Sequence, residues 1–348
     1  MEAKDINIRE LASLAGVSIA TVSRVINNPQ LVQPDTREHV LEVMRRVNYA
    51  PAWTVESRLS GRSRLIAFLF SEKDYYFYSS IRDGLESIVG LRGYTVLYCP
   101  IEAEPQRRSQ QLKTIFEQKL DGAIWALRDF HPEDIRMIDE RQVPLLLARK
   151  YDSAPADRYN CCYINFAEAS YRMTRHLLEM GHRRIGLMFE NVSQQFMNSF
   201  CQGWERALRE EQAPIEDDLL LNAPNTMQGG YTKAVELLER GEMPEAVFCA
   251  SDEQAFGVLK AAHEKGVPVP ERLAVAGFTD SPMSNLCDPE LTTIDLPIYR
   301  LGIIAARMLF DVIEDTGSEV TPGEVVLQPK LRIRRSCGNE KPINVLFE

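Results

Sequence analysis

Residues 8–27 read IRELASLAGVSIATVSRVIN, a pattern that predicts two short helices separated by a tight turn. Gly16 supplies the left-handed backbone position that ends the first helix, and Ser18 is a natural N-cap for the second. Apolar residues recur at helical spacing along the first helix, at Ile8, Leu11, Ala12 and Ala15. The stretch therefore predicts a helix-turn-helix, a motif whose second helix contacts DNA bases.

The outward face of the second helix carries short side chains, several of them polar and one basic. Val22, Val25 and Ile26 are expected to point toward the first helix, which leaves Ile19, Ala20, Ser23, Arg24 and Asn27 facing outward. Side chains of this size can enter the major groove of DNA. We therefore expect a DNA-binding head here, rather than two helices of an ordinary α-helical domain.

Each outward residue has an expected role at a DNA surface. Arg24 is expected to bind guanine directly, because its planar fork matches the two acceptors on that base. Ile19 and Ala20 are expected to contact thymine methyl groups or to exclude other bases. The residues expected to contact phosphates and position the helix are Ser18, Thr21, Ser23 and Asn27, together with Thr36 and Arg37 at the start of a third helix over 34–49.

The charge of the chain is unevenly distributed. Residues 1–64 contain 9 Lys and Arg against 7 Asp and Glu, whereas the rest of the chain contains 31 against 43. An acidic body does not bind DNA nonspecifically, so the small basic head must supply the affinity. Because one such head makes few phosphate contacts, the charge pattern favours two copies acting together in a dimer.

From residue 65 onward, short apolar runs alternate with amphipathic segments. The expected strands of a first series are 65–70, 94–99, 122–127, 144–149 and 160–166, and those of a second series are 184–189, 217–222, 245–251 and 272–278. Two such series in tandem predict an α/β body of two doubly wound parallel-sheet subdomains. Ligands of these sheets bind at the carboxyl ends of the strands, here in the cleft between the subdomains.

The sequence predicts an all-α helix-turn-helix domain at 1–51, a hinge linker at 52–64, a body at 65–336 and a tail at 337–348. A helix over 299–314 and final strands over 325–327 and 331–334 follow both series. Both subdomains are therefore expected to be discontinuous, the first over 65–165 and 296–324, the second over 166–295 and 325–336. The tail has no heptad repeat, so we expect a dimer without further assembly.

Short motifs along residues 6–336 occur in an order that one known family shares. They include ASLAGVS (12–18), TVSRVIN (21–27), NYAP (48–51), GHRRI (181–185), SD (251–252), GF (277–278), LTTI (291–294) and RRS (334–336). On these motifs the chain resembles the lac-repressor (LacI) family of bacterial transcription regulators, whose body is similar to a periplasmic binding protein. The resemblance implies a homodimer that binds a palindromic operator. It also implies a small-molecule effector in the inter-subdomain cleft that raises or lowers the affinity for that operator.

The linker departs from what the resemblance implies. In the family it folds into a hinge helix on DNA, and a leucine enters the minor groove at the operator centre. Here Leu59, the expected equivalent, falls one place late, and Arg58 stands where the leucine would be. One residue is a rotation of about 100° around a helix. Either the hinge helix begins one residue later, or the protein does not kink its operator in this way, or the segment is an unstructured tether.

The expected effector site also departs from the family pattern. The arginine that anchors the ligand in sugar- and purine-responsive relatives corresponds to Phe200 here. The Asn-Asp pair of the family corresponds to Ser251 and Asp252, and its two consecutive acids correspond to Thr279 and Asp280. The chain therefore lacks a cation and a carboxylate that would bind sugar hydroxyls or an acidic ligand.

The turn after the first strand is unusually aromatic and reads SEKDYYFY over 71–78. With Phe200 opposite, we expect Glu72, Tyr75 and Phe77 to line the cleft with flat apolar walls, which suit a sugar or a planar ring compound. Two alternatives remain. The same aromatic residues could pack a subdomain interface or the first helix of the body, and the cleft could bind nothing, which would leave control to a protein partner.

Other functional classes fit the sequence less well. No apolar run approaches the roughly 20 residues that span a bilayer, and no signal peptide is evident, so we expect a cytoplasmic protein without membrane contact. A solute-binding protein would share the α/β body but not the DNA-binding head. No phosphate-binding loop, GxSxG or HExxH motif is present, which argues against an enzyme. Seven cysteines indicate reduced thiols. Cys161 and Cys162 lie in an expected strand, and neither a metal nor a cofactor is expected. The expected function is therefore that of a transcriptional regulator, most simply a repressor.

Overall fold

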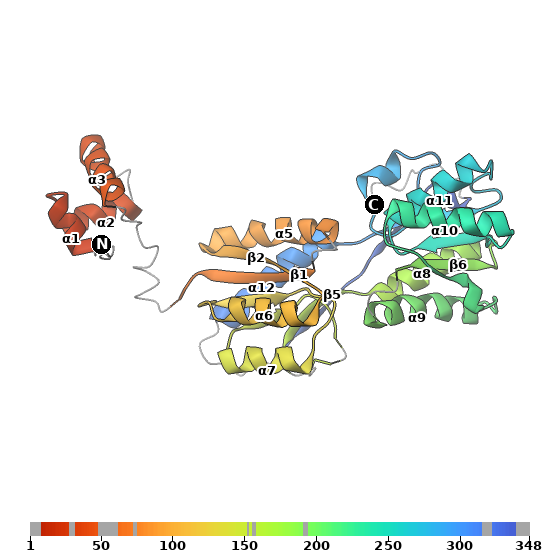
Figure 1. Cartoon of the computed structure of the whole chain (residues 1–348), viewed down its shortest axis with the longest axis horizontal. Coiled ribbons are helices and arrows are strands. Elements are labelled where there is room, and N and C mark those ends of the chain that lie inside the picture. Colours follow the sequence, from red (N-terminus) through yellow and green to blue (C-terminus); the bar gives the residue numbers. More distant parts are fainter. Residues whose placement is uncertain are drawn as a thin grey trace. The chain divides into compact units, whose positions relative to one another are not determined.

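The computed structural model describes residues 8–27, 32–47, 62–71, 75–151, 153–154, 158–190, 194–314 and 322–338. The chain divides into two units, Met1–Ser63 and Arg64–Glu348, both drawn in Figure 1. Among the described residues, no helix combines the length and the apolar character needed to cross a membrane.

The first unit contains three helices, α1 (Ile8–Leu14), α2 (Ile19–Asn27) and α3 (Pro34–Arg46). Their apolar faces meet in one small core, formed by Leu11, Ala12, Ala15, Val22, Val25, Val40, Val43 and Met44. For the first two helices, the helical spacing in the sequence therefore predicted the core residues Leu11, Ala12, Ala15, Val22 and Val25 correctly. The third helix ends at Arg46, three residues earlier than expected.

The second unit begins with a six-stranded parallel sheet of order β11-β5-β4-β3-β1-β2. Its strands are β1 (Leu65–Ser71), β2 (Thr95–Ile101), β3 (Gly122–Trp125), β4 (Leu145–Leu147), β5 (Asn160–Ile164) and β11 (Glu324–Leu327). The order in which the chain adds strands to the sheet reverses between β1 and β3, as in a doubly wound fold, while all six strands stay parallel. The strands confirm the expected first series.

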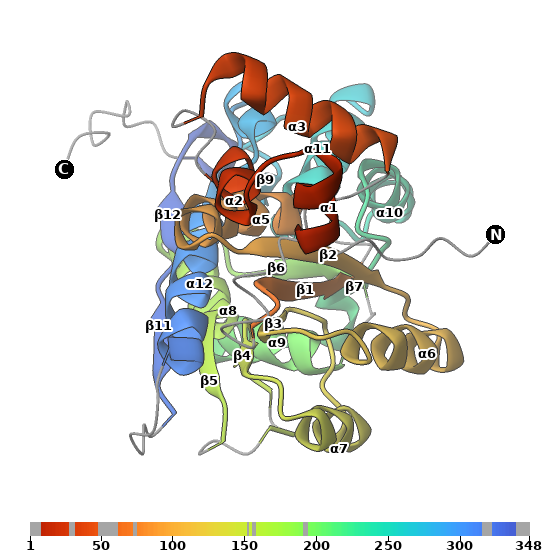
Figure 2. The ribbon, with the colours of Figure 1, turned by 90° about the vertical axis from the view of Figure 1, so that its left-hand side faces the viewer.

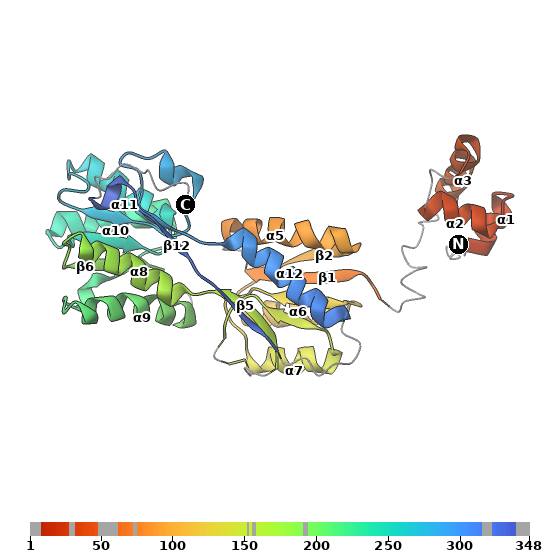
Figure 3. The same cartoon turned by 180° about the vertical axis from the view of Figure 1, so that it is seen from behind.

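Helices cover both faces of this sheet. On one face lie α5 (Tyr75–Val89), continued by the turn η3 (Gly90–Arg92), and α12 (Ile298–Glu314); on the other lie α6 (Pro105–Phe116) and α7 (Pro132–Arg141), as Figures 2 and 3 show. Alternate residues of β1 serve the two faces, because Phe68 packs with α5 and Leu69 packs with α6. A Cβ atom at Gly84 of α5 would collide with the backbone of α12, so this glycine lets the two helices approach closely.

A four-stranded parallel sheet of order β7-β6-β8-β9 forms the second half of the unit. Its strands are β6 (Ile185–Phe189), β7 (Leu220–Asn222), β8 (Ala246–Cys249) and β9 (Ala274–Ala276). One face carries α8 (Phe166–Glu179) and α9 (Gln194–Glu210), and the other carries α10 (Met227–Arg240) and α11 (Asp252–Glu264). Figure 3 shows the two helix pairs on opposite sides of this sheet. The second expected series is thus confirmed.

The final strands correct one predicted boundary. Residues 325–336 were expected to belong with the second subdomain, but β11 pairs in parallel with β5, which places Val325 opposite Cys162 in the first sheet. Later residues leave that sheet, because β12 (Lys330–Arg332) pairs antiparallel with β10 (Thr293–Asp295). Ser336 donates from its hydroxyl to the carbonyl of Val275 in the second sheet, so this end of the segment lies where it was expected. Apolar periodicity identified both strands, but it carries no information on which sheet a short strand joins.

The cysteine pair lies in a strand, as expected. Cys162 is fully buried in β5 and Cys161 is partly buried. Burial raises the pKa of the Cys161 thiol to about 12, so this thiol stays protonated and unreactive near neutral pH. Among the described residues, no group of His, Cys, Asp and Glu could hold a metal ion.

Acid is expected to weaken the packing of α8 through His176. This side chain is buried, and its Nε2 lies 3.1 Å from Sγ of Cys337 in the closing turn η6 (Arg335–Cys337). Burial lowers the pKa of His176 below its usual 6.5. Because the unfolded chain binds the proton more readily than the folded chain, stability falls as pH drops below about 6.5 toward the folded-state pKa. The melting temperature should therefore fall less between pH 7 and pH 5 in H176Q than in the unaltered protein, and equal falls would contradict the assignment.

Candidate functional site

The turn between α1 and α2 is built as expected. Gly16 has φ of +61°, the left-handed conformation that lets the chain turn sharply. Ser18 caps α2, because its Oγ accepts a hydrogen bond of 3.0 Å from the backbone N–H of Thr21 and lies 2.8 Å from the Thr21 hydroxyl. These contacts fix the direction in which α2 leaves the turn.

The exposed face of α2 matches the residues expected to contact DNA. Ile19 is 45% exposed although it is apolar, and Ser18, Ala20 and Arg24 are also exposed. Thr21 and Ser23 are half-buried, and the side chain of Asn27 lies outside the described set. An isoleucine held open to solvent on a helix that also presents an arginine is typical of a surface that is covered by a ligand.

The remaining expected DNA contacts are only partly described. Thr36 and Arg37 lie in the first turn of α3 and are half-buried. The backbone N–H of Arg37 already donates to the carbonyl of Gln33, so a phosphate contact there would come from the side chain. Leu59 lies outside the described residues, so the departure in the hinge stays a prediction.

In the second sheet, Asp252 forms a closed polar network at the start of α11. Its side chain is fully buried. Oδ1 accepts from the Thr293 hydroxyl at 2.6 Å, and Oδ2 accepts from the Ser281 backbone N–H at 2.6 Å and from the hydroxyls of Ser284 and Thr279 at 3.0 and 3.2 Å. Ser251 caps the same helix through the N–H of Gln254. The carboxylate that was expected to bind effector therefore holds the loop after β9 in place.

Asp280 is also committed to partners within the protein. Its Oδ1 accepts a hydrogen bond of 2.6 Å from Nη2 of Arg334, and its Oδ2 lies 3.7 Å from Nε of Arg332. Arg334 is only 7% exposed and also donates to the carbonyl of Leu291. Thr279 and Asp280 have φ values of 130° and 54°, a strained backbone that this ion pair and the Asp252 network hold in place.

Phe200 is a core residue, which corrects its expected place in a cleft wall. The side chain is fully buried, stacks on Phe248 at 5.2 Å and meets the edge of Phe278 at 4.7 Å. It packs α9 against the second sheet. An aromatic side chain can form the wall of a cleft or pack in a core, and the sequence alone did not distinguish these two places for Phe200.

The aromatic run at the first sheet is described in part. Glu72 lies outside the described residues, and Tyr75 and Phe77 belong to α5 with side chains outside the described set. Tyr78 is 2% exposed, packs against Phe68 and Phe70, and donates from its hydroxyl to the carbonyl of Ala126 at 2.6 Å. Tyr78 therefore packs α5 against the first sheet, which agrees with the alternative that these aromatic residues pack the first helix of the body.

Arg149 was missed by the sequence analysis. It follows β4 at the carboxyl edge of the first sheet, and its Nη2 lies 3.4 Å from the hydroxyl of Tyr78. The sequence signal was present in the run PLLLAR (144–149), where a cation directly follows a buried strand. Ligand-binding side chains of such sheets commonly occupy this position.

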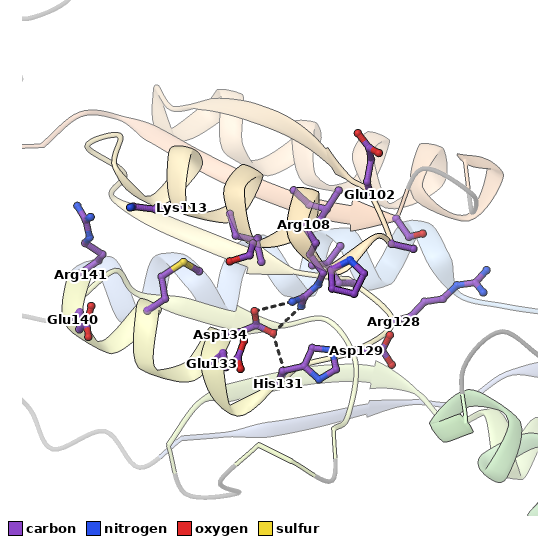
Figure 4. Close-up of a pocket in the computed structure, with 18 residues that line it drawn as sticks. Glu102, Arg108, Lys113, Arg128, Asp129, His131, Glu133, Asp134, Glu140 and Arg141 are labelled. Atoms are coloured by element: carbon purple, nitrogen blue, oxygen red, sulfur yellow. Dashed lines mark hydrogen bonds and ion pairs between the residues drawn. The ribbon is translucent and has the colours of Figure 1, made fainter.

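A pocket of about 480 Å³ opens between α6 and α7, beside the ends of β1, β2 and β3. Figure 4 shows Arg108 extending from α6 to Asp134 on α7 across this pocket. The two side chains form a bidentate ion pair at 2.7 and 2.9 Å, and Asp134 also accepts from the backbone N–H of His131. Arg108 lies over the ring of Trp125. The charges of Arg108 and Asp134 therefore neutralise each other within the pocket.

Removal of Arg108 is expected to destabilise the second unit. The side chains of Arg108 and Asp134 are 14% and 5% exposed, so R108A would leave a buried carboxylate without its cation, at a cost of about 3–5 kcal/mol. R107A is the matched control, because Arg107 pairs with Glu102 at the surface and such pairs contribute less than about 1 kcal/mol. Thermal melts of both variants measure the difference, and equal melting temperatures would refute it.

Comparisons with known proteins match both units. A family described as "Bacterial regulatory proteins, lacI family" matches residues 7–52, and a "Periplasmic binding protein-like domain" matches residues 174–337. The chain is 27% identical to the HTH-type transcriptional repressor PurR of Actinobacillus pleuropneumoniae, over 95% of this chain and 98% of that protein. It is 28% identical to catabolite control protein A of Staphylococcus epidermidis, over 94% and 98% respectively.

Two solved structures are similar to the whole chain. The lac repressor dimer bound to operator and the anti-inducer ONPF has a TM-score of 0.77 and 26% identity, covering 96% of this chain and 99% of that one. A complex of the transcriptional regulator CelR with cellobiose has a TM-score of 0.71 and 28% identity, covering 95% and 99%.

Proposed function

We infer the function from the finding that the chain belongs to the lacI family of bacterial regulatory proteins: it is a DNA-binding regulator of transcription with an effector-binding domain. Its relatives include proteins named as transcriptional repressors, and we assign repression to this chain as well. The relatives are regulators, and we propose that this protein also acts by binding rather than by catalysis. Because such a regulator must reach chromosomal DNA, we propose that it acts in the cytoplasm.

One observation carries this proposal, the exposed face of α2. Ile19, Ala20 and Arg24 lie open to solvent on a short helix whose opposite face is buried in the core of the head. Arg24 would bind the O6 and N7 acceptors of guanine, and Ile19 would contact a thymine methyl group. The Ser18 cap orients the helix so that its N-terminal end enters the major groove.

We propose that the protein binds its operator as a homodimer. The lac repressor similar to this chain is a dimer on its operator. Two identical heads related by a twofold axis require two half-sites of inverted sequence, which doubles the number of phosphate contacts that one weakly basic head can make. The division into a head at 1–51, a linker at 52–64 and a two-part body serves this arrangement.

An effector is proposed to bind the body at the carboxyl ends of its strands. The similar CelR binds cellobiose, and one further similar regulator, from Enterococcus faecium, binds ribose. Binding that favours one arrangement of the two sheets would change the spacing of the two heads, and through it the affinity for operator.

Selection of DNA from a random-sequence pool by the purified full-length protein tests the proposal. The expected result is enrichment of one inverted repeat, which the protein then protects from nuclease as a dimer. Enrichment of DNA without a shared sequence would overturn the assignment of a specific operator. A single half-site bound by one protomer would overturn the dimer.

A further inference from the structure

The pocket of about 480 Å³ between α6 and α7 is formed by the first sheet and its helices. Among the described residues, those that line it all fall between Ser71 and Arg141, whereas the second sheet includes no residue before Ile185 of β6. The volume lies within the roughly 300–1,000 Å³ that is usual for small-molecule sites. A ligand of this pocket therefore needs no contribution from the second sheet.

The two helices give the pocket walls of opposite charge. The charged residues that line it are Arg108 and Lys113 on α6, and Glu133, Asp134, Glu140 and the terminal Arg141 on α7. Figure 4 shows Lys113 and Arg108 extending from α6, and Glu133 and Glu140 from α7. A ligand with charge of one sign is attracted by one wall and repelled by the other. The walls therefore suit a ligand that carries both signs.

The ion pair that crosses the pocket leaves hydrogen-bond donors open. Arg108 lies over the ring of Trp125, and its Nη1 and Nη2 donate to Asp134 at 2.9 and 2.7 Å. A guanidinium has five N–H groups, and among the described residues Arg108 has no hydrogen-bond acceptor besides Asp134. Since the Arg108 side chain is 14% exposed and lines the pocket, its remaining N–H groups can donate to a ligand there.

Apolar side chains lie between the charged groups. Leu112 of α6 and Leu127, which follows β3, are buried, and Met137 of α7 is half-buried. All three line the pocket together with Ile101 at the end of β2. A hydrocarbon side chain of a ligand would displace water from this surface, which favours binding.

We propose that the pocket between α6 and α7 binds an α-amino acid or a short peptide in its zwitterionic form. The carboxylate accepts hydrogen bonds from Arg108 and from Lys113, and the ammonium group donates to Glu133 or Glu140. Asp134, beside Arg108, repels a simple anion, whereas the ammonium group of a zwitterion offsets that repulsion. The site goes beyond the proposed function, because its occupation is measured without DNA and does not depend on the exposed face of α2.

The test is a thermal-shift screen of the full-length protein with matched compounds. Amino acids, dipeptides and tripeptides with neutral side chains are each compared with two derivatives, the N-acetyl form, which keeps only the carboxylate, and the carboxamide, which keeps only the ammonium group. Ligands that bind only the folded state raise the melting temperature. A rise with a zwitterion that exceeds the rise with both derivatives supports the proposal, and the length series identifies amino acid or peptide. An equal rise with either derivative, or no rise with any zwitterion, overturns it.

Variants of α6 connect the binding to this pocket. Ser109 is exposed and lines the pocket, so the ring introduced by S109Y would occupy it and reduce the affinity in calorimetric titration roughly tenfold or more. Q110Y is the matched control, because Gln110 is also exposed but lies about 100° further around the helix. K113Q should reduce the affinity by roughly three- to tenfold through loss of a charge-assisted contact. Its control is K119Q, at an exposed residue beyond the end of α6.

Both controls are expected to bind the zwitterion as the unaltered protein does. Unchanged affinity in S109Y overturns the assignment of the site, even if the zwitterion binds elsewhere on the protein. Melting temperatures of S109Y and Q110Y without ligand show whether the introduced ring disturbs the fold. If S109Y melts lower than Q110Y, the comparison of K113Q with K119Q decides instead, and equal affinities of that pair overturn the proposal.

Discussion

Replacement of Arg24 by alanine is expected to abolish sequence-specific DNA binding while the protein stays folded. Arg24 is exposed on α2 and contributes nothing to the core of the head. A bidentate contact with guanine contributes about 1–3 kcal/mol, and a dimer makes it twice, so the affinity for operator falls by roughly 30-fold or more. A gel-shift titration against the selected inverted repeat measures this loss.

The variant R46A is the matched control for R24A. Arg46 is exposed at the end of α3, and R46A removes the same charge from the same unit. It should weaken binding to all DNA sequences slightly and equally, because it can act only on the phosphate backbone. Specific binding by R24A that equals that of R46A would rule out Arg24 as the residue that contacts guanine.

Replacement of Asp252 by alanine is expected to cause a large loss of stability in the second unit. Four donors point at this fully buried carboxylate, from Thr279, Ser281, Ser284 and Thr293. Without it these donors lose their shared acceptor, and those of Ser284 and Thr293 are fully buried, at a cost of about 3–5 kcal/mol. The strained backbone at Thr279 also loses its support. Thermal melts should show a lower melting temperature and a less cooperative transition.

The surface residue Asp288 is the control for this second variant. Its side chain is 89% exposed and pairs with Arg335 at 3.4 Å, a kind of ion pair that contributes little. D288A should therefore melt as the unaltered protein does. If D252A also melts unchanged, the network is not a source of stability, and Asp252 is again a candidate for contact with a ligand.

The sequence predicted the parts of the fold that follow from local patterns. The Gly16 turn, the Ser18 cap and the buried Val22 depend on residues a few positions apart, so the sequence was sufficient to identify them. The same holds for both series of strands, because a strand buried on both faces is a continuous apolar run.

The candidate effector site was predicted less well, for a physical reason. Whether Phe200 faces a cleft or a core depends on its packing against Phe248 and Phe278, which lie far from it in the sequence. The same is true of Asp252, whose partners include Thr293 some forty positions later. Arg149 was missed because its position became informative only when Tyr78 was seen beside it.

The parallel pairing of β11 with β5 has a consequence for the synthesis of the protein. A nascent chain emerges from the ribosome in order, so all of the second sheet is made before α12 and β11 exist. Until then the first sheet lacks both an edge strand and a covering helix, and apolar residues such as Leu309 have not yet reached it. The first sheet, whose strands are the first to be synthesised, is therefore the last to be completed. Its open edge is the part of the growing polypeptide that most needs protection by a chaperone.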